Sequence, residues 1–186
     1  LMYMYNPALV NGVIDARYPL DIMSENFIHT KNEFTLSFWY YIEGWKYKYN
    51  ETKKILDWDN GKLTVELNST DNTMIVSMVD LKGNTQKCVI EDIKLQKWNF
   101  VCLTLWNRSL DIILDDKYSQ SCSQDNLPNY SNSSYMELLG NNGFNGQLSN
   151  VYFYNYARHL GDTLDLYQLG PYYENWILTL ASKLQG

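Results

Sequence analysis

The chain has 186 residues, with 15 Lys and Arg against 21 Asp and Glu, so its formal net charge is −6 at pH 7. Hydrophobic residues make up 45% of the chain and aromatic residues 15%, including 16 Tyr and 6 Trp. This content of rings and apolar residues excludes an intrinsically disordered chain. The acidic balance argues against a nucleic-acid partner, because such proteins present a basic face to phosphates. The length suits one domain with a substantial core.

The chain opens with an apolar and aromatic segment, Leu1-Met2-Tyr3-Met4-Tyr5. Tyr is enriched at membrane interfaces, so residues 1–11 are predicted to be an N-terminal extension that can follow a membrane anchor lying before residue 1. The alternative is that this segment is the edge of a first strand. Within the sequence itself, no apolar run reaches the roughly 18 residues that a spanning helix needs.

A hydrophobic period of two along most of the chain predicts β-strands. In residues 34–42, every second residue is apolar or aromatic and is expected to face the core. Residues 98–106 are apolar on both faces, which is typical of a central strand that is covered on both sides. The other predicted strands are residues 62–68, 73–79, 109–114, 135–139 and 147–154. Inward positions in the first two of these are Leu63, Val65, Leu67, Met74, Val76 and Met78.

The segments between these strands carry turn residues, and helical patterns occur only near the end of the chain. Asp59-Asn60-Gly61 and Lys82-Gly83-Asn84 can supply the positive φ of tight turns, and Asp115-Asp116 fits a short hairpin. The polar residues 126–134 predict a surface loop, and residues 162–167 and 174–184 predict helix. Regular short strands without alternating helices predict an all-β protein built as an antiparallel sandwich.

Three aromatic-rich motifs follow one another in a fixed order. They are FTLSFW at 34–39, WNFVCLT at 98–104, and LLG at 138–140 followed by FNGQLSNVYFY at 144–154. In this order and spacing, they resemble the laminin G-like and pentraxin-like modules of the concanavalin A-like lectin/glucanase superfamily. The family's hairpin often closes with Asp-Gly, whereas this chain has Asp115-Asp116. This departure bears on the type of turn and not on the fold.

The resemblance covers residues 12–170 and implies a two-sheet antiparallel jelly-roll sandwich with a short C-terminal helix. Residues 171–186 then form a C-terminal aromatic and helical tail. The motif rings are expected to fill the core between the sheets, and two motif glycines to permit tight backbone bends. These rings are Trp39, Trp98, Phe144 and Tyr152, and the glycines are Gly140 and Gly146.

The cysteines and the glycosylation sequons bear on the compartment. Cys88, Cys102 and Cys122 are too widely spaced for a Cys-x-x-Cys metal motif. The odd count is compatible with one disulfide plus a free thiol or with three buried thiols, and the sequence leaves both open. Sequons in or beside turn-like segments favour a secreted or surface-exposed location. They begin at Asn50, Asn68, Asn107, Asn129 and Asn132.

The carboxylates and histidines do not form a catalytic pattern. Glucanases of the superfamily carry Glu-x-Asp-x-(x)-Glu on one strand, which supplies a nucleophile and a proton donor. Here Glu66 stands alone in its strand, and the adjacent Glu91 and Asp92 point to opposite faces. The two histidines, His29 and His159, lie at expected strand ends, with no nucleophile elbow in the sequence. The sequence therefore predicts no enzymatic activity.

Calcium is the one cofactor that the resemblance implies. Family members often hold it in loops at the rim of the sandwich through Asp, Asn and carbonyl oxygens, which suit a hard cation. The candidate ligands are Asp57, Asp59 and Asn60, joined by Asn141 and Asn142 from another loop. The alternative is that Asp-Asn-Gly is an ordinary hairpin turn.

Two clusters of rings outside the predicted strands are candidate ligand contacts, because exposed rings stack on sugars or anchor protein partners. They are Trp45, Tyr47 and Tyr49 in a polar loop, and Tyr172, Tyr173 and Trp176 near the end of the chain. The alternative is that these rings cover the rim of the sandwich or pack against the terminal helix.

Three functions follow from these patterns. The first is a non-catalytic recognition or adhesion module that binds a glycan or a protein through rim loops in an extracellular, cell-surface or virion-associated protein. The second is a structural component with assembly neighbours, such as a minor capsid or envelope protein of a virion. The third is a glycoside hydrolase, which the missing carboxylate pair disfavours.

Overall fold

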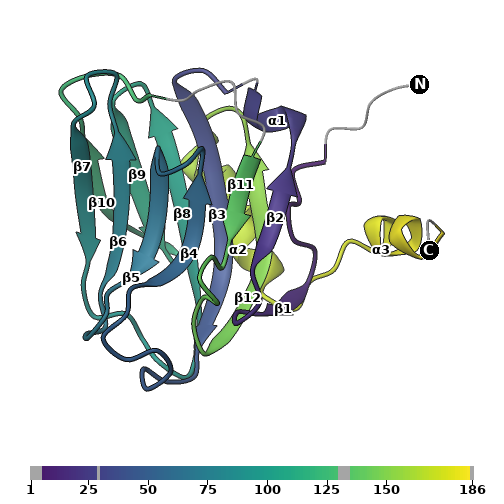
Figure 1. The fold of residues 1–186 in the computed structure, drawn as a ribbon. Coiled ribbons are helices and arrows are strands. Elements are labelled where there is room, and N and C mark those ends of the chain that lie inside the picture. Colours follow the sequence, from purple (N-terminus) through teal and green to yellow (C-terminus); the bar gives the residue numbers. More distant parts are fainter. Residues whose placement is uncertain (1–5, 29, 130–134, 185–186) are drawn as a thin grey trace.

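The computed structural model describes residues 6–28, 30–129 and 135–184, and two six-stranded antiparallel sheets face each other within them (Figure 1). Sheet A has the order β1-β12-β3-β8-β9-β10, and sheet B has the order β2-β11-β4-β5-β6-β7. This arrangement confirms the predicted all-β jelly-roll sandwich. Strands that lie far apart in the sequence, such as β1 and β12, pair side by side, so the sandwich is closed by long-range contacts.

The strands of sheet A are β1 (Val13–Asp15), β3 (Glu33–Ile42), β8 (Trp98–Trp106), β9 (Ser109–Leu114), β10 (Lys117–Ser123) and β12 (Gly146–Tyr154). Those of sheet B are β2 (Leu20–Met23), β4 (Lys53–Trp58), β5 (Leu63–Leu67), β6 (Met74–Val79), β7 (Thr85–Ile90) and β11 (Tyr135–Leu138). The helices are α1 (Glu25–Ile28), α2 (Leu160–Leu169) and α3 (Trp176–Leu184). The sequence patterns missed β1, β2, β4, β7 and β10, because these strands are short or carry many polar residues.

The core between the sheets follows the predicted alternation. The inward residues of β3 are all buried, as are those of β5 and β6. At its centre, Trp58 of β4 lies 5.5 Å from Phe34 and 5.2 Å from Phe153, measured between ring centroids, and both contacts are edge-on. Burying such rings is the main stabilising contribution to a sandwich of this size.

A second apolar cluster lies on the outer face of sheet A, beneath α2. Trp39 stacks on Tyr167 of α2 with 5.3 Å between ring centroids, and Phe100 and Tyr152 join the same cluster. The prediction that Trp39 and Tyr152 fill the inter-sheet core is therefore wrong, whereas Phe144 does lie there. Trp39 occupies an outward position because its neighbours Phe38 and Tyr40 point inward. This cluster explains why β8 is apolar on both faces.

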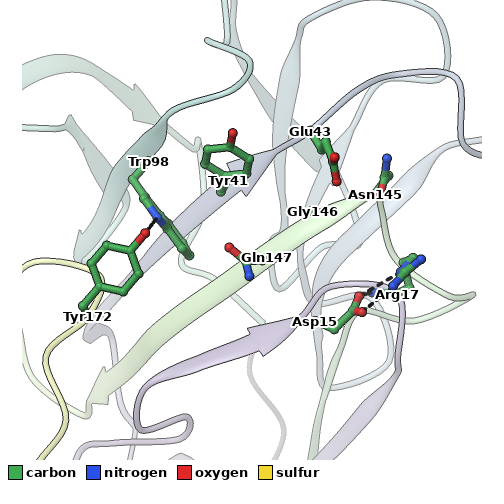
Figure 2. A pocket seen from close by; sticks show the side chains of 9 residues that line it. All are labelled: Asp15, Arg17, Tyr41, Glu43, Trp98, Asn145, Gly146, Gln147 and Tyr172. Atoms are coloured by element: carbon green, nitrogen blue, oxygen red, sulfur yellow. Dashed lines mark hydrogen bonds and ion pairs between the residues drawn. The ribbon is translucent and has the colours of Figure 1, made fainter.

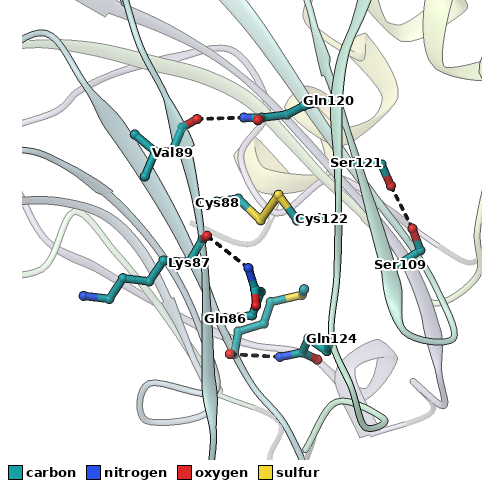
Figure 3. Close-up of a disulfide and its surroundings, with 10 residues drawn as sticks. Gln86, Lys87, Cys88, Val89, Ser109, Gln120, Ser121, Cys122 and Gln124 are labelled. Carbon is teal, nitrogen blue, oxygen red and sulfur yellow. Dashed lines mark hydrogen bonds between the residues drawn. A yellow bond between two sulfur atoms is a disulfide. The ribbon is translucent and has the colours of Figure 1, made fainter.

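A disulfide joins the two sheets at one edge of the sandwich. Cys88 of β7 bonds to Cys122 of β10, and these are the last strands of sheets B and A (Figure 3). Beside the disulfide, Gln120 Nε2 donates a 2.9 Å hydrogen bond to the carbonyl oxygen of Val89. Cys102 is free and buried, and its burial raises the pKa of the thiol to about 12. Of the two alternatives, the structure thus has one disulfide and one free thiol.

The N-terminal end of the described chain lies along β12. Ala8 forms an isolated bridge with Tyr152, and the N–H of Leu9 donates to the carbonyl oxygen of Val151 at 2.8 Å. Residues 1–5, on which the anchor prediction rests, lie outside the described residues. α3 stands away from the sheets and buries none of its residues (Figure 1). No helix among the described residues is long and apolar enough to cross a membrane.

Candidate ligand-binding pocket

A cavity of about 500 Å³ opens on the outer face of sheet A, beyond the part that α2 covers (Figure 2). Its size falls in the range of small-ligand pockets, about 300–1,000 Å³. Its lining residues are Asp15, Arg17, Tyr41, Glu43, Trp98, Asn145, Gly146, Gln147 and Tyr172.

The floor of the pocket is one row of side chains across four neighbouring strands. Asp15 of β1 pairs with Gln147 of β12, Gln147 pairs with Tyr41 of β3, and Tyr41 pairs with Trp98 of β8. Directly opposed residues in antiparallel strands have their Cβ atoms about 4.5–5.5 Å apart. All four side chains point away from the core, because the alternate residues beside them are buried between the sheets. The sheet register therefore lines up a carboxylate, an amide and two rings.

Three aromatic rings form one end of the pocket. Tyr41 and Trp98 lie 5.8 Å apart between ring centroids at 55°, and Trp98 and Tyr172 lie 5.7 Å apart at 79°. The indole Nε1 of Trp98 donates a 2.8 Å hydrogen bond to the hydroxyl of Tyr172. Figure 2 shows Trp98 and Tyr172 side by side, with Tyr41 next to them. The rings present apolar faces with polar edges at a partly open surface.

Charged and amide groups form the other end. Arg17 binds Asp15 through two side-chain contacts, Nε to Oδ1 at 3.0 Å and Nη2 to Oδ2 at 2.6 Å. These hydrogen bonds from Arg17 hold the pKa of the Asp15 carboxyl below its usual value. Glu43 and Asn145 lie on the same side, and the N–H of Glu43 donates to the Asn145 carbonyl oxygen at 2.9 Å. One Arg and two carboxylates thus lie around this end.

Gly146 is needed where β12 passes β3 at the pocket. A Cβ atom built at Gly146 would come within 1.9 Å of the Tyr41 carbonyl oxygen, so any side chain there would displace the backbone. This observation agrees with the expectation that Gly146 permits a close backbone approach.

The wall that carries Tyr172 is held by Asn150. This residue has φ 48° and sits at a register shift in β12. Its Nδ2 donates to the carbonyl oxygens of Gly170 at 3.1 Å and Tyr173 at 2.8 Å, while its Oδ1 accepts from the N–H of Gly12 at 2.8 Å. One side chain therefore ties the segment on both sides of Tyr172 to the body of the sandwich.

A second asparagine fixes the end of the same segment. Asn11 Oδ1 accepts from the N–H of Asn175 at 2.8 Å, and Asn11 Nδ2 donates to the Asn175 carbonyl oxygen at 3.3 Å. Ser149 Oγ also donates to the carbonyl oxygen of Pro171. Residues 170–175 are therefore attached to sheet A through polar contacts at both ends.

Of the six predicted contact rings, the structure brings Tyr172 into the pocket. Tyr173 and Trp176 are exposed but do not line it, and Trp176 begins α3. Sequence reasoning missed Tyr41 as a site residue and assigned Trp98 to the core. The available signal was their parity: each ring occupies an outward position near the end of a strand.

The rings of the 45–49 loop mostly cover the rim of the sandwich. Trp45 packs against the core, and the Lys53 ammonium lies 5.2 Å from the centroid of its ring. The Tyr47 hydroxyl donates to the Asn142 carbonyl oxygen at 3.0 Å. Tyr49 is exposed.

The predicted calcium ligands contact neighbouring groups of the protein, in their own turns or in the 45–49 loop. Asp57 Oδ1 accepts from the N–H of Gly61 at 2.7 Å, and the other carboxylate oxygen lies 4.0 Å from Lys54 Nζ. Asp59 and Asn60 both have positive φ, as the turn alternative requires. Backbone oxygens of Asn141 and Asn142 accept from the side chains of Lys48 and Tyr47. Among the described residues, no group of three or more His, Cys, Asp or Glu has the arrangement of a metal site.

The sequon asparagines differ in exposure. Asn50 and Asn107 are exposed, whereas Asn68 and Asn129 are half-buried. Asn68 Nδ2 donates to Asp71 Oδ1 at 2.8 Å, which occupies the nitrogen that a glycan would use. Asn132 lies outside the described residues. Asn50 and Asn107 are therefore the sequons best placed for modification.

The comparisons with known proteins agree with the two-sheet jelly roll. The family model described as the concanavalin A-like lectin/glucanases superfamily matches residues 20–162. The chain belongs to this superfamily. The search of curated protein sequences found no significant match to this chain.

Solved structures with the same fold include receptor-binding domains of botulinum neurotoxins. The serotype G binding domain is 13% identical with a TM-score of 0.68, covering 90% of this chain and 47% of that one. The serotype C/D mosaic domain is 11% identical with a TM-score of 0.70, covering 89% and 45%. The DC domain in complex with SialylT is 16% identical with a TM-score of 0.65, covering 87% and 45%. The chain thus spans less than half the length of these proteins, and at such identities the likeness shows the fold.

Proposed function

We propose that this protein is a non-catalytic recognition module that binds the end of a glycan in the pocket on the outer face of sheet A. The observation that carries the proposal is the row of Asp15, Gln147, Tyr41 and Trp98 across four strands, closed by Tyr172. A sugar has apolar C–H faces and a rim of hydroxyls. Rings at one end and carboxylate and amide groups at the other match these two kinds of surface.

Each group of the pocket has a defined role in this proposal. The exposed faces of Trp98 and Tyr172 stack on a sugar ring, because both rings already pack against other side chains and lose little freedom on binding. Glu43 accepts hydrogen bonds from sugar hydroxyls, and the amide of Gln147 both donates and accepts. Such a pocket orients a ligand without supplying a reaction.

The fold relatives support the class of ligand. One neurotoxin domain that shares this fold was solved in complex with SialylT. The non-catalytic role is supported by the chain itself, because Glu43 and Asp15 are the only carboxylates that line the pocket in the described residues, and Asp15 is bound to Arg17. A hydrolase of the retaining or inverting type needs two carboxyl groups free to act on one glycosidic bond.

A secreted or cell-surface location is part of the proposal. The Cys88–Cys122 disulfide between the two edge strands favours an oxidising compartment. Exposed sequons at Asn50 and Asn107 are compatible with it. A mobility shift after treatment of the natural protein with an N-glycosidase would test this location.

Attachment to a larger assembly is the second candidate function. It is favoured by the apolar side chains that α3 exposes, which include Trp176, Ile177 and Leu180. Replacing Leu180 with Glu would then dissociate an oligomer that light scattering detects, without changing glycan binding. A monomeric parent protein would remove this support.

The decisive experiment compares two tryptophans of the same strand. Trp98 and Trp106 lie at opposite ends of β8 and both point to the outer face, but only Trp98 lines the ring-lined pocket. Trp98→Ala should weaken binding to glycans identified on an array by about tenfold or more, as for a central aromatic contact. Trp106→Ala should leave binding unchanged. Equal effects of both substitutions, or none, would contradict the proposed function.

A further inference from the structure

The charged end of the pocket has more negative than positive groups. Asp15, Glu43 and Arg17 line it together, and its remaining lining residues are uncharged. Two carboxylates and one guanidinium line the pocket, and the whole chain carries a formal charge of −6. A ligand that enters the pocket therefore meets a site with one excess negative charge.

The single cation of the pocket is already paired. Asp15 Oδ1 accepts from the backbone N–H and from Nε of Arg17, both at 3.0 Å, and Oδ2 accepts from Nη2 at 2.6 Å. The paired contacts use the fork of the guanidinium, which is the geometry that a carboxylate or sulfate ligand would need. An acidic sugar could use this same Nε–Nη2 edge of Arg17 only by displacing Asp15.

Glu43 also favours an uncharged ligand over an anionic one. Its side chain is exposed at the pocket, next to Asn145 (Figure 2). A carboxylate accepts hydrogen bonds and donates none when ionised, so it suits sugar hydroxyls. An anionic group at the same place would be repelled by Glu43 and would receive no hydrogen bond from its carboxylate.

We infer that the pocket selects uncharged, hydroxyl-rich glycan ends and discriminates against sialylated and sulfated ones, with Glu43 and the Asp15–Arg17 pair as the residues that determine this selectivity. The inference rests on the proposed function and specifies its class of ligand. The expected discrimination is about fivefold, the factor that corresponds to about 1 kcal/mol of repulsion between two unit charges 4 Å apart in water.

The test uses an array of neutral glycans together with the sialylated and the sulfated form of each, followed by titration of the pairs that bind. The intact protein should bind the neutral member about fivefold more tightly, and 1 M salt, where screening acts within about 3 Å, should reduce this ratio. Glu43→Gln should lower the ratio of neutral to acidic affinity about fivefold, whatever its effect on the neutral members themselves. This change removes the excess charge but keeps an acceptor.

Two further variants sharpen the test. Asp15→Asn releases Arg17 from its ion pair and should also raise the affinity for acidic members. Glu66→Gln makes the same change of charge on the outer face of sheet B, across the sandwich from the pocket, and should leave the ratio unchanged.

The outcomes separate this inference from the proposed function. Equal or tighter binding of the acidic members by the intact protein would overturn the inference, and so would a ratio that Glu43→Gln leaves unchanged. In both cases a loss of binding in Trp98→Ala would still support the pocket as a glycan site. Absence of binding to every member of the array would overturn both.

Discussion

The hydrogen bond from Trp98 Nε1 to the hydroxyl of Tyr172 joins two residues that are 74 positions apart in the sequence, with 2.8 Å between nitrogen and oxygen. Trp98 begins the central strand β8, and Tyr172 lies in the segment that follows α2. The bond orients the ring of Tyr172 at a position where its side chain is otherwise exposed. The C-terminal segment thereby supplies one wall of the pocket.

Removing only the hydroxyl of Tyr172 tests this relationship. In Tyr172→Phe, the ring remains but the acceptor for Trp98 Nε1 is lost. A typical hydrogen bond contributes about 0.5–1.5 kcal/mol, so glycan affinity should fall about two- to tenfold. Titration measures this change, and Tyr173→Phe is the matched control, because Tyr173 is the next residue of the same segment and does not line the pocket. Full affinity in Tyr172→Phe would show that the bond does not orient the ring for binding.

Asn150 should hold the segment that carries Tyr172 in place. Asn150→Gly keeps the positive φ but loses the hydrogen bonds to Gly170, Tyr173 and Gly12. Loss of buried polar partners costs about 1–3 kcal/mol, so the melting temperature should fall by several degrees. Hydrogen exchange should rise in residues 170–175 more than in β8.

Asn150→Asp separates the two functions of this side chain. It keeps the acceptor for the N–H of Gly12 but places a carboxylate against the carbonyl oxygens of Gly170 and Tyr173. It should therefore destabilise the protein more than Asn150→Gly does. The reverse order of the two melting temperatures would mean that the carbonyl contacts do not hold the segment.

The disulfide should affect stability without affecting the pocket. Cys88 and Cys122 enclose a loop with a sequence separation of 34, for which the chain-entropy model gives about 4 kcal/mol. Reduction should lower the melting temperature, whereas glycan affinity should persist below the transition, because the pocket lies on β1, β12, β3 and β8. The Cys88→Ser, Cys122→Ser double variant is the control, and its melting temperature should not respond to reductant. Loss of binding in this folded variant would contradict the separation.

Asp80 should make the protein sensitive to acid. A hydrogen bond from Asn126 and further bonds from Asn84 and the N–H of Lys82 lower the pKa of its carboxyl to about 2. Because this pKa is lower in the folded state than the unfolded value near 4, the stabilisation is present above about pH 4 and is lost as the pH falls toward 2. Denaturation curves between pH 5 and 2 should show a smaller loss for Asp80→Asn than for the parent.

The matched control for that measurement is Asp116→Asn, because Asp116 is exposed in the hairpin turn between β9 and β10. It should follow the pH dependence of the parent protein. If Asp80→Asn follows the parent as well, the turn at Asp80 does not contribute to the acid response.

A comparison of calcium with chelator distinguishes a metal site at Asp57, Asp59, Asn60, Asn141 and Asn142 from an ordinary turn. Asp57 accepts from the N–H of Gly61 and lies 4.0 Å from the Lys54 ammonium, so we expect the same melting temperature in calcium and in chelator. If calcium instead raises the melting temperature, and Asp57→Asn abolishes this rise, the site is established. Asp57 is half-buried, and Asp71→Asn is the control because it makes the same change at an exposed carboxylate.

The class of fold could be predicted from the amino-acid pattern alone. The alternation in residues 34–42 sets which side chains are buried, because successive residues of a strand point to opposite faces. The order of the aromatic motifs was enough to indicate the superfamily, and Tyr172 was recognised as a candidate contact.

The rings that form the pocket could not be identified before the three-dimensional arrangement was known. Trp39, Trp98 and Tyr152 share one outward parity, but α2 covers Trp39 and Tyr152 and leaves Trp98 at the pocket. The row from Asp15 to Trp98 depends on the register of four strands that are distant in the sequence, and the pairing of Cys88 with Cys122 depends on which edges of the two sheets meet. Register and sheet order arise from long-range packing, which local periodicity does not encode.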